Sequence, residues 1–444
     1  MTVALKRITR ILLGQSGYAA VVQTLLANAF ILGLNVGTGI LTARLLGPAG
    51  RGALAAMILW PQFLSFLLAL GLPSALLYNL KRRPGESDTL VGAASVMGAV
   101  MGVVAILAGM LLIPLWLRQY PVEVVRFAQF AMLTAPVGLL GLVFNSAMQA
   151  RDAFTLYNLT RYLPPLLTLF SLVLLAATHH LTPFSSALAY VLAGLPVSVV
   201  AAGWAWRQYR PTLRAFAASL RQLLSYSLRS GGIDLLNTLA LHLDRALVVG
   251  FLDPAAMGLY VVALSLSRVL NVFNTAVITV LFPKASGRPK AEVVALTGHA
   301  ARISTAATVL AAVALILIGP QVLGLLYTED FTAATAVFQL LVAEAVLSGT
   351  ASVLAQAFMA LDRPGVVTIL QGMGVGLSIP LLVWLVPRYG LEGAGMALLG
   401  SALVRFTFVY ASFPLVLKVS PPRPWMKRDE LSELLQQALQ RMRE

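Results

Sequence analysis

Apolar residues along the chain gather into twelve stretches that are separated by short polar breaks. A helix needs about 20 apolar residues to cross a bilayer, and most of these stretches reach that length. The breaks carry the glycine and proline expected of turns, as at Gly47-Pro48 and Asp253-Pro254. The pattern therefore predicts twelve transmembrane helices, over residues 19–43, 52–80, 89–117, 127–149, 162–178 and 184–206, and then 231–251, 258–282, 294–318, 333–359, 366–387 and 394–417.

The composition supports this assignment. Of the 444 residues 59% are apolar and only 11% are charged, whereas soluble proteins carry about 25% charged residues. We therefore expect an all-α polytopic membrane protein. The chain has no cysteine, which excludes disulfides, cysteine-ligated zinc and iron–sulfur clusters.

The net charge of +15 would suit a nucleic-acid-binding protein, but the positions of the charges favour a membrane surface. Of the 32 Lys and Arg residues, 23 lie on the side of the predicted helices that holds both chain ends, and 5 lie on the other. Lys- and Arg-rich loops face the cytoplasm, next to anionic lipid headgroups. We therefore expect cytoplasmic termini and no nucleic-acid partner. The apolar stretch after Arg10 is expected to remain as the first helix rather than to be cleaved as a signal peptide.

Two short segments occur twice in the chain. Leu46–Gly52 and Leu252–Gly258 share the pattern Leu-x-Pro-Ala-x-x-Gly and lie 206 residues apart, after the first and seventh spans. The fourth and tenth spans end in Ala150-Arg151-Asp152 and Ala360-Leu361-Asp362, which lie 210 residues apart. Nearly equal separations at equivalent helix ends indicate a six-plus-six duplication with the same topology in each half, as in transporters built from parallel repeats.

The duplication predicts four parts. Residues 1–206 and 231–417 are expected to form two six-helix lobes, joined by a linker over residues 207–230 and followed by a tail over residues 418–444. In the linker and the tail, apolar residues recur at helical spacing among basic ones, which predicts amphipathic helices on the cytoplasmic membrane surface. A plain linker remains the alternative for residues 207–230.

The sequence carries little that would support an enzyme. It lacks a zinc-protease HExxH motif, a phosphate-binding GxxxxGK[ST] loop and a GxSxG nucleophile elbow. The predicted outer loops are short, and the neighbouring His179 and His180 fit a solvated loop better than a metal site. We therefore expect neither a metal nor another cofactor, and not an enzyme.

Charged residues inside the predicted spans lie in the second half only, and they are Asp234, Asp244, Arg245, Arg268, Arg302, Glu344 and Arg405. Charge inside a bilayer is costly and usually functional. Glu344 and Arg405 are the natural partners for an ion pair that only holds helices together. Arg268, near mid-depth, would then lack a carboxylate, and arginine binds phosphate in a bidentate manner. This predicts a cationic cavity for a phosphate-bearing substrate.

The segment Ala43–Gly52, together with Leu70–Ala75, resembles the oligosaccharide flippases of polysaccharide biosynthesis, which belong to the multidrug/oligosaccharidyl-lipid/polysaccharide (MOP) exporter superfamily. The segments Leu243–Gly250, Gly258–Ala263 and Leu326–Phe331 are similar to the second-half signature of that family. The resemblance covers nearly the whole chain in helix number and order.

This resemblance implies two six-helix lobes around a central cavity, as in multidrug exporters of the MATE type. It also implies a bacterial inner-membrane flippase that moves undecaprenyl-diphosphate-linked oligosaccharide by alternating access, with polysaccharide assembly enzymes as partners. Cationic cavity residues meet the diphosphate in such flippases. We carry that role onto Arg268, Arg245 and Arg405.

Two other functions remain open. The chain lacks the acidic residue that cation-coupled multidrug exporters keep in the first helix, but coupling to H⁺ or Na⁺ through Glu344, Asp244 or Asp234 would still suit an antiporter. A membrane glycosyltransferase or ligase is disfavoured by the short outer loops. A lipid II flippase fits less well, because it would have cavity arginines in its first helices.

Overall fold

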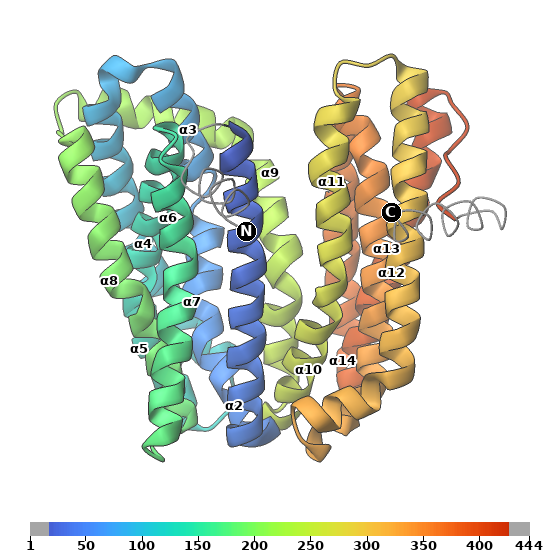
Figure 1. The fold of residues 1–444 in the computed structure, drawn as a ribbon. Coiled ribbons are helices and arrows are strands. Elements are labelled where there is room, and N and C mark those ends of the chain that lie inside the picture. Colours follow the sequence, from blue (N-terminus) through green and yellow to red (C-terminus); the bar gives the residue numbers. More distant parts are fainter. Residues whose placement is uncertain (1–16, 426–444) are drawn as a thin grey trace, which may run out of the picture. The chain divides into compact units, whose positions relative to one another are not determined.

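The protein is helical throughout the part of the chain that the structure describes (Figure 1). The structure is a computed structural model that describes residues 17–425, without the side chains of residues 17–25, 229–231, 233, 234, 237 and 241. Within the described residues nine helical segments are long and apolar enough to cross a membrane. The predicted all-α polytopic membrane class is therefore confirmed.

The chain divides into two compact units. The first extends to Val261 and includes Leu326–Asp330, and the second holds Val262–Leu325 and the residues from Phe331 onward. The helices of the first unit are α2 (Gly17–Leu68), α3 (Leu72–Arg82), α4 (Ser87–Trp116), α5 (Val122–Ala131), α6 (Ala135–Ala150), α7 (Phe154–Ala177), α8 (Pro183–Tyr209), α9 (Phe216–Phe251) and the first part of α10 (Pro254–Ser267).

The second unit contains the end of α10 and the remaining helices. These are the 3-10 turn η3 (Arg268–Leu270), α11 (Asn271–Ala285), α12 (Lys290–Leu326), α13 (Thr335–Ala360), α14 (Pro364–Ser412) and the π-helical turn η5 (Phe413–Leu417). The units divide inside α10, whereas the sequence places the division before residue 231. The six-plus-six organisation therefore stays a prediction.

Two helices each contain a sharp kink at a glycine. α2 bends at Gly47, where φ is 66°, and α14 bends at Gly390, where φ is 56°. Only glycine adopts this backbone conformation without strain. Each kink falls in a predicted break, so α2 holds the first span and the start of the second, and α14 holds the last two spans.

The two copies of the Leu-x-Pro-Ala-x-x-Gly segment pack against each other within the first unit. A methyl group at Gly52 would overlap the carbonyl oxygen of Pro254, and a methyl group at Gly258 would overlap the carbonyl oxygen of Pro48. The contact is reciprocal, because each glycine meets the proline of the other copy. The second repeated motif also adopts one conformation twice, since Asp152 and Asp362 both have φ of 56°.

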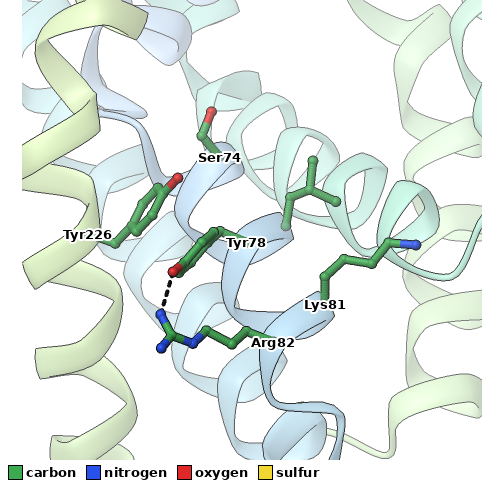
Figure 2. A pocket seen from close by; sticks show the side chains of 6 residues that line it. Ser74, Tyr78, Lys81, Arg82 and Tyr226 are labelled. Carbon is green, nitrogen blue, oxygen red and sulfur yellow. Dashed lines mark hydrogen bonds between the residues drawn. The ribbon is translucent and has the colours of Figure 1, made fainter. Parts of the chain in front are cut away.

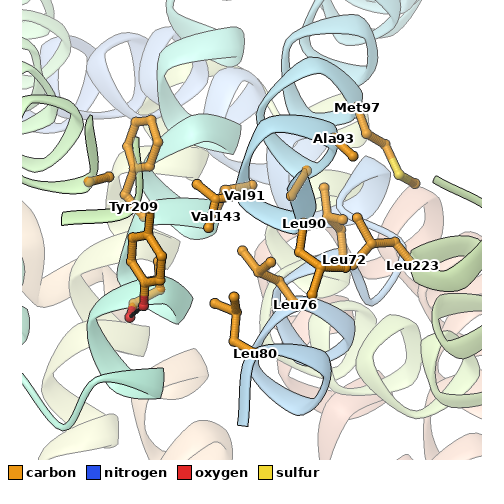
Figure 3. Packing of buried hydrophobic residues seen from close by; sticks show 14 of the residues in the cluster. Leu72, Leu76, Leu80, Leu90, Val91, Ala93, Met97, Val143, Tyr209 and Leu223 are labelled. Atoms are coloured by element: carbon orange, nitrogen blue, oxygen red, sulfur yellow. Dashed lines mark hydrogen bonds between the residues drawn. The ribbon is translucent and has the colours of Figure 1, made fainter. Parts of the chain in front are cut away.

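The segment between the two predicted lobes is largely helical. α9 begins at Phe216 and continues to Phe251, so the helix predicted in the linker and the seventh span are one element. Leu223 is fully buried in an apolar core with residues of α3 and α4, and Leu220 packs against that core, which Figure 3 shows in part. Leu213, in contrast, is largely exposed. The helix predicted in the tail lies mostly outside the described residues.

The second unit has an apolar core of its own. Phe358 of α13 and Phe413 of η5 are both fully buried, and their ring centroids lie 5.0 Å apart. Leu281 of α11 and Leu370 of α14 belong to the same cluster. This core packs α11, α13 and α14 together, and α13 and α14 carry Glu344 and Arg405, two of the charged residues discussed next.

Candidate functional site: arginines within the helices

Arg268 lies where the eighth predicted span is interrupted. α10 ends at Ser267, and η3 begins at Arg268 before α11 continues from Asn271. A 3-10 turn within a longer helix changes the direction of the side chains, and it often marks a functional position. The second span is interrupted in a comparable way between α2 and α3, where Leu70 and Gly71 have positive φ.

Arg268 forms an ion pair with Glu344 of α13. The Arg268 Nη1 atom lies 3.3 Å from Oε2 of Glu344, and the Ser348 hydroxyl donates a 2.5 Å hydrogen bond to Oε1 of Glu344. The Glu344 side chain is only 7% exposed, whereas that of Arg268 is 33% exposed. The carboxylate is therefore enclosed, and the guanidinium keeps an accessible edge.

Arg405 of α14 makes hydrogen bonds to neutral groups. Its Nη1 donates to Oε1 of Gln371 at 3.1 Å, and its Nη2 donates to the Ser348 carbonyl at 2.9 Å and to the Ser352 hydroxyl at 3.3 Å. No carboxylate of the described residues lies within ion-pair distance of Arg405. A pocket of about 190 Å³ adjoins this group, lined by Ala351, Ser352, Ala355, Gln356, Val367, Leu370, Gln371, Arg405 and Val409.

These contacts correct the predicted ion pair. The sequence favours Glu344 with Arg405, but Glu344 pairs with Arg268, and Arg405 is held by Gln371, Ser348 and Ser352. Which arginine pairs with Glu344 depends on the rotation of α13 and α14 about their axes and on the break at η3. The hydropathy pattern reveals neither of these. Arg268 thus has the carboxylate that it was expected to lack, and no carboxylate of the described residues pairs with Arg405.

A polar ladder on α13 organises this cluster. It consists of Glu344, Ser348, Ser352 and Gln356, which recur at every fourth residue and so lie on one face of the helix. The Ser352 hydroxyl donates to the Ser348 carbonyl at 2.7 Å, and the Gln356 side-chain amide donates to the Ser352 carbonyl at 3.3 Å. Sequence reasoning missed the ladder beyond Glu344, although its spacing in an apolar stretch was a usable signal.

Three of the predicted site residues lie in the first unit, on α9. Asp244 is buried and accepts a 3.1 Å hydrogen bond from the Tyr260 hydroxyl. The Nε atom of Arg245 is buried and has no hydrogen-bond partner among the described residues. The side chain of Asp234 lies outside the described part of the chain. The structure therefore brings Arg268, Glu344 and Arg405 together in one unit and places Asp244 and Arg245 in the other.

The first half also carries a charge within a long helix. Arg161 directly precedes the predicted fifth span, and it lies inside α7, which begins at Phe154. Its Nη2 donates a 2.8 Å hydrogen bond to Oδ1 of Asn28 on α2, and its guanidinium lies 5.3 Å from the ring centre of Tyr157. The polar Asn28 therefore has a cationic partner.

Three arginines within the helices can bind an anion. Arg161, Arg245 and Arg405 lie within long helices and have no ion pair among the described residues, so their guanidinium groups can donate hydrogen bonds to anionic oxygens. In the same part of the chain, no three metal-ligating His, Asp or Glu side chains gather in one place. Each of these guanidinium groups suits binding of an anion.

Comparison with known proteins decides the family. The sequence profile of a family described as polysaccharide biosynthesis protein matches residues 41–336, which is more than half of the chain. The chain belongs to this family. The predicted resemblance to a family of polysaccharide biosynthesis is thereby confirmed.

The chain is also similar to a curated protein. The chain is 23% identical over 212 residues to a protein of Haloferax volcanii named as a probable low-salt glycan biosynthesis flippase, Agl15. That match covers 47% of this chain and 44% of the relative, so the chain spans less than half the length of the curated relative that it matches.

Among solved structures, the lipid II flippase MurJ in an inward closed conformation has a TM-score of 0.75 at 14% identity, over 90% of this chain and 88% of MurJ. An inward-facing MATE family multidrug resistance transporter of the MOP superfamily has a TM-score of 0.69 at 19% identity, over 87% of this chain and 95% of its own. A MOP superfamily transporter from Pyrococcus furiosus has a TM-score of 0.60 at 17% identity, over 92% of this chain and 97% of its own. These similarities show that the chain has the MATE-like fold of this superfamily.

Proposed function

We propose that the protein is a flippase that moves undecaprenyl-diphosphate-linked oligosaccharide across the bacterial inner membrane by alternating access. The observation that carries this proposal is Arg405, a cation within an apolar helix whose hydrogen bonds go to neutral groups. A charge in that position is costly unless an anion or water meets it. A diphosphate supplies such an anion.

The proposed roles follow from the contacts. Arg405, Arg268 and Arg245 donate hydrogen bonds to the diphosphate as it passes. Glu344 holds Arg268 in position through their ion pair and is the first candidate for coupling to H⁺. Asp244 and Asp234 are the other coupling candidates, and Na⁺ is the other candidate ion. The Lys- and Arg-rich side faces the cytoplasm, where the assembly enzymes that supply the substrate lie.

Translocation in a defined membrane tests the proposal. The full chain is reconstituted into vesicles that contain a fluorescent undecaprenyl-diphosphate-linked oligosaccharide, and an added glycosidase that cannot enter reports the fraction reaching the outer leaflet. We expect that fraction to exceed that of empty vesicles, and Arg405→Ala to abolish the gain. A wild-type protein that leaves the fraction unchanged overturns the proposal.

The two alternatives give different results in the same preparation. A cation-coupled antiporter would move small amphiphilic cations against an ion gradient without moving the lipid-linked sugar. A glycosyltransferase or ligase would change the mass of the sugar, which mass spectrometry of the recovered lipid detects.

A further inference from the structure

A pocket with two basic side chains lies in the first unit, on the side of the predicted helices that carries the Lys and Arg excess. This pocket of about 580 Å³ opens between α3 and α9, lined by Ser74, Leu77, Tyr78, Lys81, Arg82 and Tyr226 (Figure 2). Its volume falls in the range of about 300–1,000 Å³ that is typical of small-molecule sites. None of the arginines to which a role was assigned above lines this pocket.

One wall of this pocket is a pair of stacked tyrosines. The ring centres of Tyr78 and Tyr226 lie 4.3 Å apart at an interplanar angle of 22°. Tyr78 is 39% exposed, so part of its surface is open to a ligand. Tyrosine joins an apolar ring to a hydroxyl, and such a pair suits a ligand ring that also has apolar faces and polar edges, as a sugar does.

The charge next to this wall belongs to Arg82. Lys81 and Arg83, its two neighbours, have carboxylate partners, because Lys81 Nζ lies 2.8 Å from Asp152 and Arg83 Nη1 lies 3.5 Å from Glu86. Arg82 donates its 2.5 Å hydrogen bond to the neutral Tyr78 hydroxyl, as Figure 2 shows, and has no ion pair with a described residue. Its positive charge is therefore available, and arginine matches phosphate oxygens well.

On the basis of the function proposed above, we propose that this pocket is an entry site for the headgroup of the lipid-linked sugar. Arg82 binds the diphosphate, and the Tyr78–Tyr226 pair contacts the first sugar ring. An anionic phospholipid offers the same phosphate chemistry but no ring. The aromatic wall favours the glycan-bearing lipid, and the two ligands can be told apart by their dependence on the tyrosines.

Binding to the full-length protein in phosphatidylcholine nanodiscs tests this site. The probes are geranyl diphosphate carrying one N-acetylglucosamine and geranyl diphosphate without a sugar, and phosphatidylglycerol is the competitor. We expect Arg82→Gln to raise the Kd of both probes about tenfold through loss of charge-assisted hydrogen bonds. The matched control Arg83→Gln removes the same charge one residue away and is expected to stay within about twofold.

The tyrosine wall is tested with Tyr226→Leu. It is expected to raise the Kd of the sugar-bearing probe about fivefold, as loss of aromatic contact does, and to leave the sugar-free probe unchanged. If Arg82→Gln and Arg83→Gln raise the Kd equally, the proposal of an entry site is overturned. Displacement of the sugar-bearing probe by phosphatidylglycerol at equal concentration overturns it as well. Because Arg82 is exposed, its variants are expected to keep the wild-type melting temperature, and Arg82→Lys gives a second variant with partial binding.

The readout separates this site from the proposed function. If the protein binds the sugar-bearing probe through Arg82 but does not translocate the lipid, the entry site is supported and the proposed function is overturned. If it translocates the lipid while Arg82→Gln changes neither probe binding nor translocation rate, the proposed function is supported and the entry site is overturned.

Discussion

The guanidinium of Arg268 and the carboxylate of Glu344 face each other across η3 and α13, with Nη1 3.3 Å from Oε2. The pair joins a position where a helix is interrupted to a helix that is mostly buried. Its two members differ in exposure, so the loss of either one has a different consequence for stability and for ligand binding.

Removing one member of this pair is expected to destabilise the protein more than removing both. Arg268→Met leaves the enclosed Glu344 carboxylate without its partner, which costs about 3 kcal/mol in comparable buried pairs. Arg268→Met with Glu344→Leu removes both charges and is expected to recover most of that loss in thermal unfolding. If the two single effects simply add in the double variant, the pair does not stabilise the fold. Translocation should remain lost in the double variant if Arg268 meets the substrate.

Arg405→Lys tests whether the planar guanidinium, and not only its charge, is required. Lysine keeps the charge but lacks the planar pair of nitrogens by which Arg405 reaches Gln371 and Ser348, so we expect translocation to fall about tenfold while folded yield is kept. Arg388→Lys is the control, because Arg388 is exposed and donates to the Trp384 carbonyl. Equal rates for the Arg405→Lys and wild-type proteins would show that only charge matters there.

The reciprocal glycine contact predicts a strong effect of a single methyl group. Gly52→Ala and Gly258→Ala would each push α2 and α10 apart, so we expect less folded protein and a lower melting temperature. Gly141→Ala, where the added methyl meets open space within α6, is expected to be neutral or stabilising by up to about 1 kcal/mol. Similar yields from Gly52→Ala and Gly141→Ala would contradict the close packing.

Tyr120, between α4 and α5, makes a pH-dependent contribution to the stability of the folded protein. It is buried, and burial raises the pKa of its hydroxyl above the ordinary value, with the nearby Asp253 charge adding to the increase. The folded state holds the phenolic proton more tightly than the unfolded state, so this contribution is complete below about pH 10 and is lost as the pH rises further. We expect the melting temperature of wild type to fall more between about pH 9.5 and pH 11.5 than that of Tyr120→Phe.

The stability of Tyr120→Phe at neutral pH and a control at Tyr389 test the same assignment. The Tyr120 hydroxyl has no hydrogen-bond partner among the described residues, so Tyr120→Phe should not destabilise the protein at neutral pH. Tyr389→Phe, at an exposed tyrosine, should retain the wild-type pH dependence. Parallel pH curves for wild type and Tyr120→Phe would refute the assignment.

The absence of cysteine makes the orientation easy to measure. His179→Cys and Ser286→Cys introduce single thiols at exposed positions of loops that the charge distribution assigns to opposite sides of the membrane. In intact cells stripped of their outer membrane, an impermeant maleimide should label His179→Cys only, and detergent should expose both. Labelling of Ser286→Cys without detergent would reverse the orientation.

The fold was largely readable from the sequence because its signals are local. Apolar length predicts the spans, and Gly47 and the Asp253-Pro254 step mark breaks where the structure has a kink or a helix end. The repeated Leu-x-Pro-Ala-x-x-Gly segments were detected, although their mutual packing was not predicted. These features depend on neighbouring residues alone.

The site was less readable because it depends on helix rotation. The carboxylate of Glu344 forms an ion pair with Arg268 and not with Arg405, because the break at η3 sets the direction of the Arg268 side chain. The fifth apolar stretch was predicted to begin at residue 162, after the charge of Arg161, whereas α7 begins at Phe154. The Arg161–Asn28 hydrogen bond joins helices that are far apart in sequence, and a single sequence does not reveal such pairs.

The reciprocal packing of Gly52 and Gly258 has a consequence for how this chain arose. A contact in which residue i of one copy meets residue j of the other, and j meets i, is the signature of a twofold axis between identical subunits. If the predicted duplication holds, a half-length ancestor would have joined to itself through this segment. The two copies would then have diverged after fusion, which would account for Arg51 and Met257 at matching positions.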